Sequence, residues 1–162
     1  MNDDDAPLSA FTSPDRDRYF EDYVAGAVYI LGEVHIDRDE MVAYSRKYDP
    51  QDMHINEEKA VQGPFKGLIA SGFYTASLMM RFLARNYLSN ASSLGSPGID
   101  GLRWLAPVRA DDLLTVQVSI VETRRSRSKS DRGIVRSLIE VINQEGQVVM
   151  DMRGVNLIAC CK

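Results

Sequence analysis

Residues 72–88 read GFYTASLMMRFLARNYL, and this stretch carries the strongest helical pattern in the chain. Arg81 and Arg85, four residues apart, mark its one polar stripe. Its apolar side chains lie on nearly every other face; they are Phe73, Ala76, Leu78, Met79, Met80, Phe82, Leu83, Tyr87 and Leu88. A helix that is apolar almost all round is buried by the rest of its fold. We therefore predict a central helix that begins at Gly72.

Strand-like runs lie on both sides of this helix in the sequence. They are residues 27–36, 101–105, 114–120, 133–143 and 147–158. Residues 114–120 alternate apolar with polar side chains, which is typical of a half-buried strand. The last two runs are joined by a short turn that contains Gly146, which predicts a hairpin. Helices and strands that segregate in this way indicate an α+β fold, with an antiparallel sheet wrapped around the central helix.

Two short helices are predicted before the central one. Asp37 and Glu40 have the spacing of a capping box, so a helix is expected over residues 38–48. It ends at Asp49 because the proline that follows keeps this residue out of the α region. Asn56 is a good N-cap for a second helix. A turn therefore joins the two helices.

The composition bounds the class of protein. The chain has 162 residues, 44% of them hydrophobic, which suits one core; we expect a flexible arm over residues 1–17 and a single domain over residues 18–162. A net charge of −4 argues against nucleic acid as a partner. No apolar run approaches the ~20 residues of a membrane span, and we expect a cytoplasmic protein. Cys160 and Cys161 are adjacent and not spaced for zinc, so no metal site is expected.

Asp49 and His54 place a carboxylate and an imidazole five residues apart in the predicted turn. Hydration of an enoyl thioester needs three things: water must lose a proton as it attacks C3, a proton must reach C2, and charge on the thioester oxygen must be stabilised. A carboxylate and a histidine that hold one water can supply the first two. Taken alone the pair is weak evidence, because Asp49 could instead accept hydrogen bonds from backbone amides of the turn.

Gly72 is placed for the third requirement, since it opens the central helix. A residue without a Cβ lets a ligand oxygen approach the backbone closely. The positive end of the helix dipole favours negative charge that develops there. We therefore predict that Asp49, His54 and Gly72 form one catalytic site.

These motifs together resemble the MaoC-like dehydratase family, which includes the (R)-specific enoyl-CoA hydratases. Asp49 and His54 match the catalytic residues of the family's Asp-x-Asn-Pro-x-His element, and residues 69–72, IASG, match its Ile-(Val/Ala)-His-Gly stretch. Residues 101–108, GLRWLAPV, resemble the family's strand that begins with glycine, carries a phenylalanine and ends in Pro-Val. The resemblance covers roughly residues 30–158.

The resemblance implies a hotdog fold and reversible hydration of an enoyl-CoA, with coenzyme A as part of the substrate and no other cofactor. It also implies a homodimer or a larger homo-oligomer whose sheets join edge to edge, with active sites near the subunit interface. The chain departs from the family pattern at four positions. Gln51 and Asp52 replace Asn and Pro, Ser71 replaces His, and Met80 falls where hydratases often have serine.

Six residues are predicted to bind the substrate; they are Gln51, Ser71, Arg103, Arg124, Arg125 and Arg127. The arginines would supply the positive charge that the phosphates of coenzyme A require. The pattern of the basic run over residues 124–129 favours a solvated loop between two strands, and the phosphate-binding interpretation stays open beside it.

Two other functions compete with hydration. A hotdog thioesterase would share the site at the helix N-terminus but would usually lack the Asp–His turn. A non-catalytic acyl-thioester-binding module is favoured if Gln51 and Asp52 have disabled the site. The sequence leaves the acyl length, its branching, the pathway and the physiological direction open.

Overall fold

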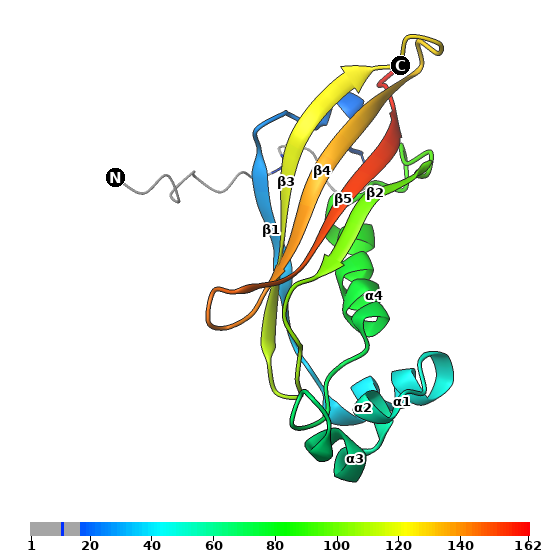
Figure 1. Ribbon diagram of the computed structural model, residues 1–162. Coiled ribbons are helices and arrows are strands. Elements are labelled where there is room, and N and C mark those ends of the chain that lie inside the picture. The colour runs from blue at the N-terminus through cyan, green and yellow to red at the C-terminus, as the bar shows by residue number, and fades with distance from the viewer. Residues whose placement is uncertain (1–10, 12–16) are drawn as a thin grey trace.

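In the computed structural model, which describes residue 11 and residues 17–162, five strands form one antiparallel sheet (Figure 1). In chain order they are β1 (Val28–His35), β2 (Gly98–Trp104), β3 (Leu113–Arg125), β4 (Arg132–Ile142) and β5 (Val148–Ala159). Their order across the sheet is β1-β3-β4-β5-β2, and every neighbouring pair is antiparallel. The predicted antiparallel sheet is confirmed, while the predicted arm over residues 1–17 lies, apart from residues 11 and 17, outside the described residues.

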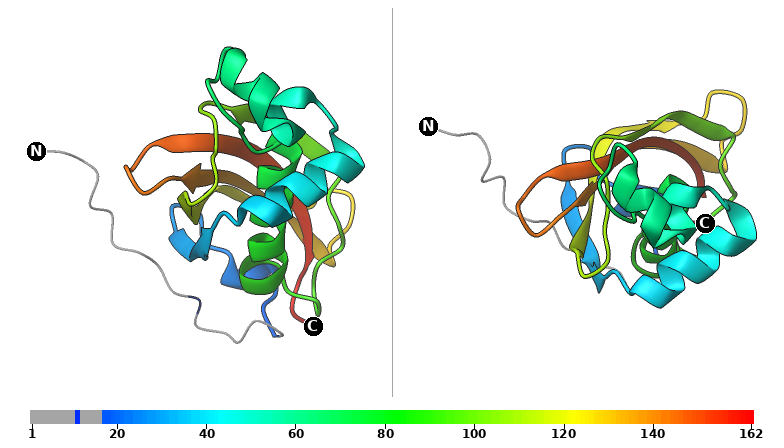
Figure 2. Two further views of the ribbon diagram at one scale, coloured as in Figure 1. Left: turned by 90° about the horizontal axis from the view of Figure 1, so that it is seen from below. Right: turned by 60° about the horizontal axis from the view of Figure 1, so that its bottom comes forward.

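The helices gather on one side of this sheet. They are η1 (Phe20–Asp22), α1 (Arg38–Tyr48), α2 (Asp52–Ile55), α3 (Glu57–Gln62), α4 (Gly72–Phe82) and the π-helical turn η2 (Leu83–Tyr87) that continues α4. Figure 2 shows α1, α2 and α3 grouped near the N-terminal end of α4. The predicted helices over residues 38–48 and after Asn56 are confirmed, and the one-turn helix α2 was not predicted. No helix among the described residues is long and apolar enough to cross a membrane.

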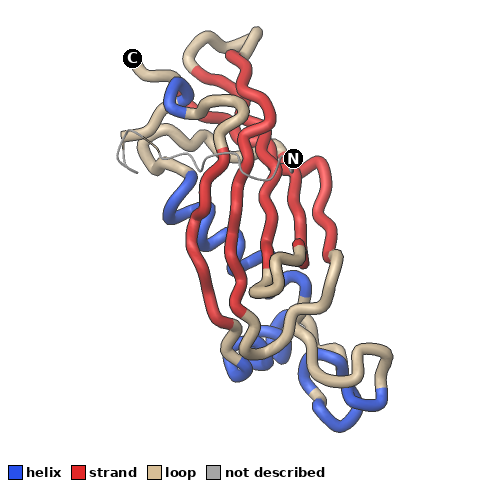
Figure 3. Tube along the Cα trace, turned by 90° about the vertical axis from the view of Figure 1, so that its left-hand side faces the viewer, coloured by secondary structure: helices blue, strands red, loops and turns tan. Residues whose placement is uncertain are grey.

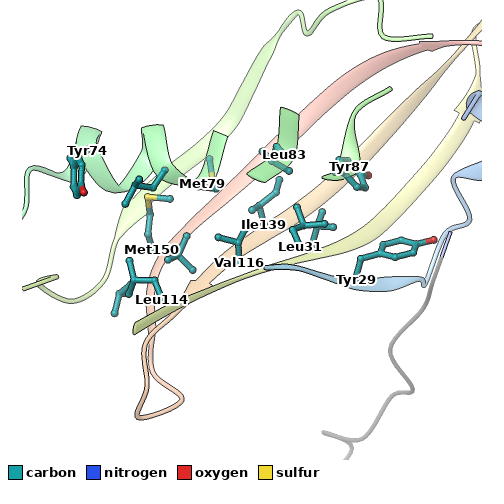
Figure 4. Close-up of a cluster of buried hydrophobic side chains, with 14 of the residues drawn as sticks. Tyr29, Leu31, Tyr74, Met79, Leu83, Tyr87, Leu114, Val116, Ile139 and Met150 are labelled. Atoms are coloured by element: carbon teal, nitrogen blue, oxygen red, sulfur yellow. The ribbon is translucent and has the colours of Figure 1, made fainter. Parts of the chain in front are cut away.

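Helix α4 crosses the inner face of the curved sheet, behind the row of strands in Figure 3. Alternate residues of β3 and β4 are buried beneath it, as the alternating sequence predicts. Figure 4 shows Met79 and Leu83 of the helical segment pointing toward Val116, Ile139 and Met150 of the sheet. All five are buried, and each contributes on the order of 1.5–3 kcal/mol to stability. A sheet wrapped around one helix in this way is the hotdog fold, which confirms the predicted fold class.

One face of α4 remains open in the single chain. Phe73 is 60% exposed and Met80 is 44% exposed, although both are large and apolar. The prediction of a helix buried on nearly every side is therefore wrong for one chain taken alone, because the sheet covers only part of the helix surface. Exposed apolar side chains of β2 and the residue after it, Ile99, Trp104 and Leu105, lie at the sheet edge that β2 forms.

Helix α1 is fixed to α4 by side-chain hydrogen bonds, and this places the turn that follows α1 beside the start of α4. Asp37 caps α1 by accepting a hydrogen bond from the Glu40 amide at 2.7 Å. The Glu40 carboxylate does not complete the predicted capping box; it accepts a hydrogen bond from the Tyr74 hydroxyl of α4 at 3.1 Å. Tyr44 of α1 and Ser77 of α4 also share a hydrogen bond, at 3.2 Å.

Candidate active site

A cavity of about 430 Å³ lies at the N-terminal end of α4. Asp49, His54 and Gly72 all line it, so the structure brings the three predicted catalytic residues to one place. Trp104 and Val108 are among the apolar residues that also line it. Cavities of this size and mostly apolar lining are usual for small-molecule sites.

Backbone hydrogen bonds tie together two of the segments that line this cavity. Asp49 ends α1, and its amide donates to the Ser45 carbonyl at 2.8 Å. Helix α2 then turns the His54 side chain inward. The segment before α4 lies against α2, because the Ile69 amide donates to the Met53 carbonyl at 3.1 Å. This pairing sets the Asp49–His54 turn against the start of α4.

The surroundings of His54 fix its tautomer. The side chain is buried, and its Nδ1 atom lies 2.8 Å from the carbonyl oxygen of Ile69. A carbonyl can only accept, so Nδ1 carries a proton and donates it. The other ring nitrogen, Nε2, faces Asp49 with 3.3 Å between Nε2 and Oδ2. In the neutral ring, Nε2 therefore presents a lone pair beside the carboxylate.

Both oxygens of the Asp49 carboxylate accept hydrogen bonds. The Ser71 hydroxyl donates to Oδ2 at 2.6 Å, and the Gln51 side-chain amide donates to Oδ1 at 2.7 Å. These two bonds, Ser71 first, lower the pKa of Asp49, and the charge of His54 adds a smaller effect in the same direction. Partial burial opposes them but does not reverse the shift. Asp49 is therefore ionised at neutral pH.

The N-terminus of α4 presents free donors to the same cavity. The amides of Tyr74 and Thr75 both donate to the Ser71 carbonyl, which closes the first turn. Among the described residues, the amides of Gly72 and Phe73 donate to no acceptor. Both residues line the cavity. Two N–H groups and the positive end of the helix dipole are thus available at the end of α4 that borders the cavity.

Gly72 also has a packing role that the sequence did not indicate. A Cβ built at Gly72 would lie 2.4 Å from Cε2 of Trp104, so the room that glycine leaves is filled by an indole ring. The glycine lets Trp104 pack against the helix start, where it also meets the Phe73 ring with 5.2 Å between ring centroids. Close approach of a ligand oxygen from that side is blocked, and only the N–H group of Gly72 remains for the predicted role.

Two of the predicted substrate-binding residues support Asp49 instead. Gln51 lines the cavity, but its amide is occupied by the Asp49 carboxylate. Ser71 is 0% exposed, and its hydroxyl points to Asp49. Arg103 lies outside the cavity, where its guanidinium donates two hydrogen bonds to the Asp151 carboxylate, at 3.0 and 2.6 Å.

The basic run spans the last residues of β3 and the loop that follows, at the end of the sheet opposite α2 and α3 in Figure 1. β3 begins at Leu113, shortly after the cavity wall, and the 12 residue steps to Arg125 span about 40 Å at ~3.3 Å each. Arg125 forms an ion pair with Glu21 at 2.6 Å. The Arg124 guanidinium lies 3.7 Å from a carboxylate oxygen of Glu122 on the same strand. The structure therefore does not bring Arg124, Arg125 or Arg127 to the cavity of their own chain.

Thr75 and Trp104 are among the residues of this cavity that sequence reasoning missed. Both were in quoted motifs, yet only their side-chain directions decide that they face the cavity. It also missed Arg109, whose guanidinium donates to the carbonyls of Leu68 and Phe65 at 3.2 and 2.6 Å. Arg109 thereby holds the loop that carries the partner of His54.

An antiparallel sheet wrapped around a helix, with a mostly apolar cavity at the helix N-terminus, defines a hotdog-fold protein. The sequence model of the MaoC like domain family matches residues 23–142, so this chain belongs to that family.

Individual relatives agree with this assignment. The chain is 28% identical over 137 residues to a 3-hydroxybutyryl-CoA dehydratase of Methylorubrum extorquens, which covers 82% of each protein. It is 26% identical over 125 residues to the uncharacterized protein YdeM of Bacillus subtilis, covering 77% of this chain and 87% of that protein. The crystal structure of a MaoC-like dehydratase from Rhodospirillum rubrum superposes with a TM-score of 0.83 at 28% identity, covering 90% of this chain and 99% of that one.

Proposed function

We propose that this protein catalyses the reversible addition of water to the double bond of an enoyl-CoA, giving a 3-hydroxyacyl-CoA. One observation carries the proposal: the Asp49 carboxylate and the His54 imidazole meet, with 3.3 Å between Oδ2 and Nε2, in a cavity that also receives the first amides of α4. The family assignment and the relative named as a 3-hydroxybutyryl-CoA dehydratase support it.

His54 is the group that takes a proton from water. Its Nδ1 proton is committed to the Ile69 carbonyl, so the Nε2 lone pair is the available base. Water held between Nε2 and the Asp49 carboxylate gives its proton to Nε2 while its oxygen attacks C3. Asp49 orients this water and stabilises the imidazolium that forms.

The helix N-terminus supports the intermediate. When the hydroxyl group joins C3, negative charge moves to the thioester oxygen. The N–H groups of Gly72 and Phe73 and the helix dipole stabilise that charge. The imidazolium of His54 then returns its proton at C2. The two hydrogens and the oxygen of one water are thus all accounted for, and the reverse sequence dehydrates the 3-hydroxyacyl thioester.

Arg127 is the remaining candidate for the phosphates of coenzyme A. Among the described residues it has no acidic partner within ion-pair distance, unlike Arg124 and Arg125. Its distance from its own cavity means that this role requires the cavity of a second chain. We expect Arg127→Ala to raise KM for a CoA thioester with little change in kcat, and to have no effect on a short thioester without the nucleotide. An unchanged KM would show that the loop is solvated and does not bind the phosphates of coenzyme A.

A homodimer is part of the proposal. The open edge at β2 and the exposed face of α4 carry Phe73, Met80, Ile99, Trp104 and Leu105, which would form one apolar patch along that side of the chain. Exposed sheet edges and large apolar patches are normally covered by a partner. Light scattering at micromolar concentration should give twice the chain mass of 18.1 kDa. A monomer would contradict this part.

Incubation with crotonyl-CoA tests the function. Loss of the enoyl absorbance with formation of 3-hydroxybutyryl-CoA supports hydration, while release of free thiol identifies a thioesterase instead. Binding without either product identifies a non-catalytic module. Asp49→Asn is the matched control, since it keeps the side-chain shape and should remove the hydration but not the fold.

A further inference from the structure

The floor of the cavity contains one hydroxyl group that the mechanism does not use. Thr75 lies on α4 one turn beyond Gly72 and is 2% exposed. It lines the cavity together with the buried side chains of Val108 and Val149, while exposed residues such as Phe73 and Trp104 form the mouth. Thr75 is therefore a polar group in the apolar, inner part of the site.

The hydroxyl of Thr75 has no partner among the described residues, and this sets it apart. The buried serines all form side-chain hydrogen bonds; they are Ser45, Ser71, Ser89, Ser92 and Ser137. Two helical serines, Ser45 and Ser77, donate to the carbonyl four residues earlier, but Thr75 does not. The Thr75 oxygen is also not among the described polar side-chain atoms that lack both solvent access and a hydrogen-bond partner. Because Thr75 lines the cavity, a ligand in the cavity can reach this oxygen.

The position of Thr75 limits what can reach it. Three residues at 1.5 Å each place it about 4.5 Å along the helix axis from Gly72, whose amide would hold the thioester oxygen. Only a few carbon–carbon bonds span that distance, so an acyl group bound at Gly72 passes Thr75 close to C3 or C4. If that acyl group were a plain alkyl chain, it would enclose the hydroxyl without a partner, which is unfavourable.

We propose that Thr75 is a specificity-determining residue whose hydroxyl forms a hydrogen bond with an oxygen-bearing substituent near C4 of a short enoyl thioester. This inference rests on the proposed function, since it takes the thioester to bind at the helix N-terminus. A site built to pair with a substrate oxygen discriminates strongly against an analogue that lacks it. The substrate class is thus a short, oxygenated enoyl-CoA.

Two substrates and two variants test the proposal. The substrates are crotonyl-CoA and 4-hydroxycrotonyl-CoA, which differ by one oxygen. We expect kcat/KM of the native protein to favour the hydroxylated substrate at least tenfold. Thr75→Val keeps the side-chain shape and should lower this ratio at least tenfold, while Thr75→Ser should retain most of it. Ser77→Ala, which removes a hydroxyl outside the cavity on the same helix, should leave the ratio unchanged.

The outcomes separate this inference from the proposed function. If the native protein hydrates both substrates with equal kcat/KM, or if Thr75→Val leaves the ratio as it was, Thr75 does not select the substrate. If neither substrate is hydrated, the proposed function fails, and calorimetric binding of the same two thioesters decides the inference: a Kd ratio of at least ten that Thr75→Val removes supports it, and equal Kd values overturn it. The melting temperature of Thr75→Val should not fall, because the hydroxyl it removes has no partner in the protein.

Discussion

Replacing Ser71 with alanine removes the hydroxyl that anchors the Asp49 carboxylate. This hydroxyl is fully buried and donates to Oδ2 at 2.6 Å. It is also the largest cause of the lowered pKa of Asp49. In Ser71→Ala only the Gln51 amide still donates to the carboxylate, so Asp49 loses both its fixed position and part of its preference for the ionised state.

The magnitude follows from the kind of bond that is lost. A hydrogen bond to a charged group contributes about 1.5–3 kcal/mol, against about 0.5–1.5 kcal/mol for a neutral one. Ser45→Ala is the matched control, because Ser45 is equally buried but donates to the neutral Met41 carbonyl at 2.9 Å. At pH 7 we expect Ser71→Ala to lose more unfolding free energy than Ser45→Ala, and to lose about tenfold or more in kcat because the pair is misplaced.

The assay is urea denaturation of the native protein and both variants across the acid range. The pKa of Asp49 is lowered in the folded state, so its stabilising effect is complete above the unfolded value of about 3.9 and is lost as the pH falls through the folded value. The difference between native protein and Ser71→Ala should therefore be largest near neutral pH and shrink below about pH 4. Ser45→Ala should show no such trend. Equal losses for the two variants, with no pH dependence for either, would refute the anchoring of Asp49 by Ser71.

Other predictions test the remaining parts of the site. Asp49→Asn and His54→Ala should each lower kcat about a hundredfold or more, and the double variant should be little worse than either, because the two residues act as a unit; near-normal hydration by both single variants would exclude the mechanism. Gly72→Ala should cost about 1–3 kcal/mol of unfolding free energy, since the new Cβ would lie 2.4 Å from the Trp104 ring. Adding Trp104→Ala should recover part of that loss, and simple additivity in urea denaturation would show that the two do not collide.

Much of the fold could be predicted because its signals are local. The alternation of residues 114–120 specifies a strand with one buried face, and the structure extends it to Leu113–Arg125. The apolar run after Gly72 specifies the central helix. The open face of that helix could not be predicted, since apolar residues at Phe73 and Met80 look the same in the sequence whether the sheet, a partner or solvent faces them.

The site was predictable in part for a related reason. Asp49 ends α1 and His54 lies on α2, which follows directly in the sequence, so their meeting depends on local geometry. The Ser71–Asp49 bond and the bond of His54 to the Ile69 carbonyl depend on how two segments pack, since the partners are 22 and 15 positions apart in the sequence. Residue type alone therefore suggested that Ser71 and Gln51 contact the substrate. Packing instead places both side chains where they donate hydrogen bonds to the Asp49 carboxylate.

The stereochemistry of hydration in D₂O tests most directly whether one Asp49–His54 pair carries out both proton transfers. One Asp49–His54 pair holds the water and also returns its proton, so the hydroxyl group at C3 and the deuterium at C2 must arrive on the same face of crotonyl-CoA. NMR of the 3-hydroxybutyryl product reports their relative configuration through the coupling between the protons on C2 and C3. Syn addition is the expected result. Anti addition would require a second acid on the opposite face and would contradict it.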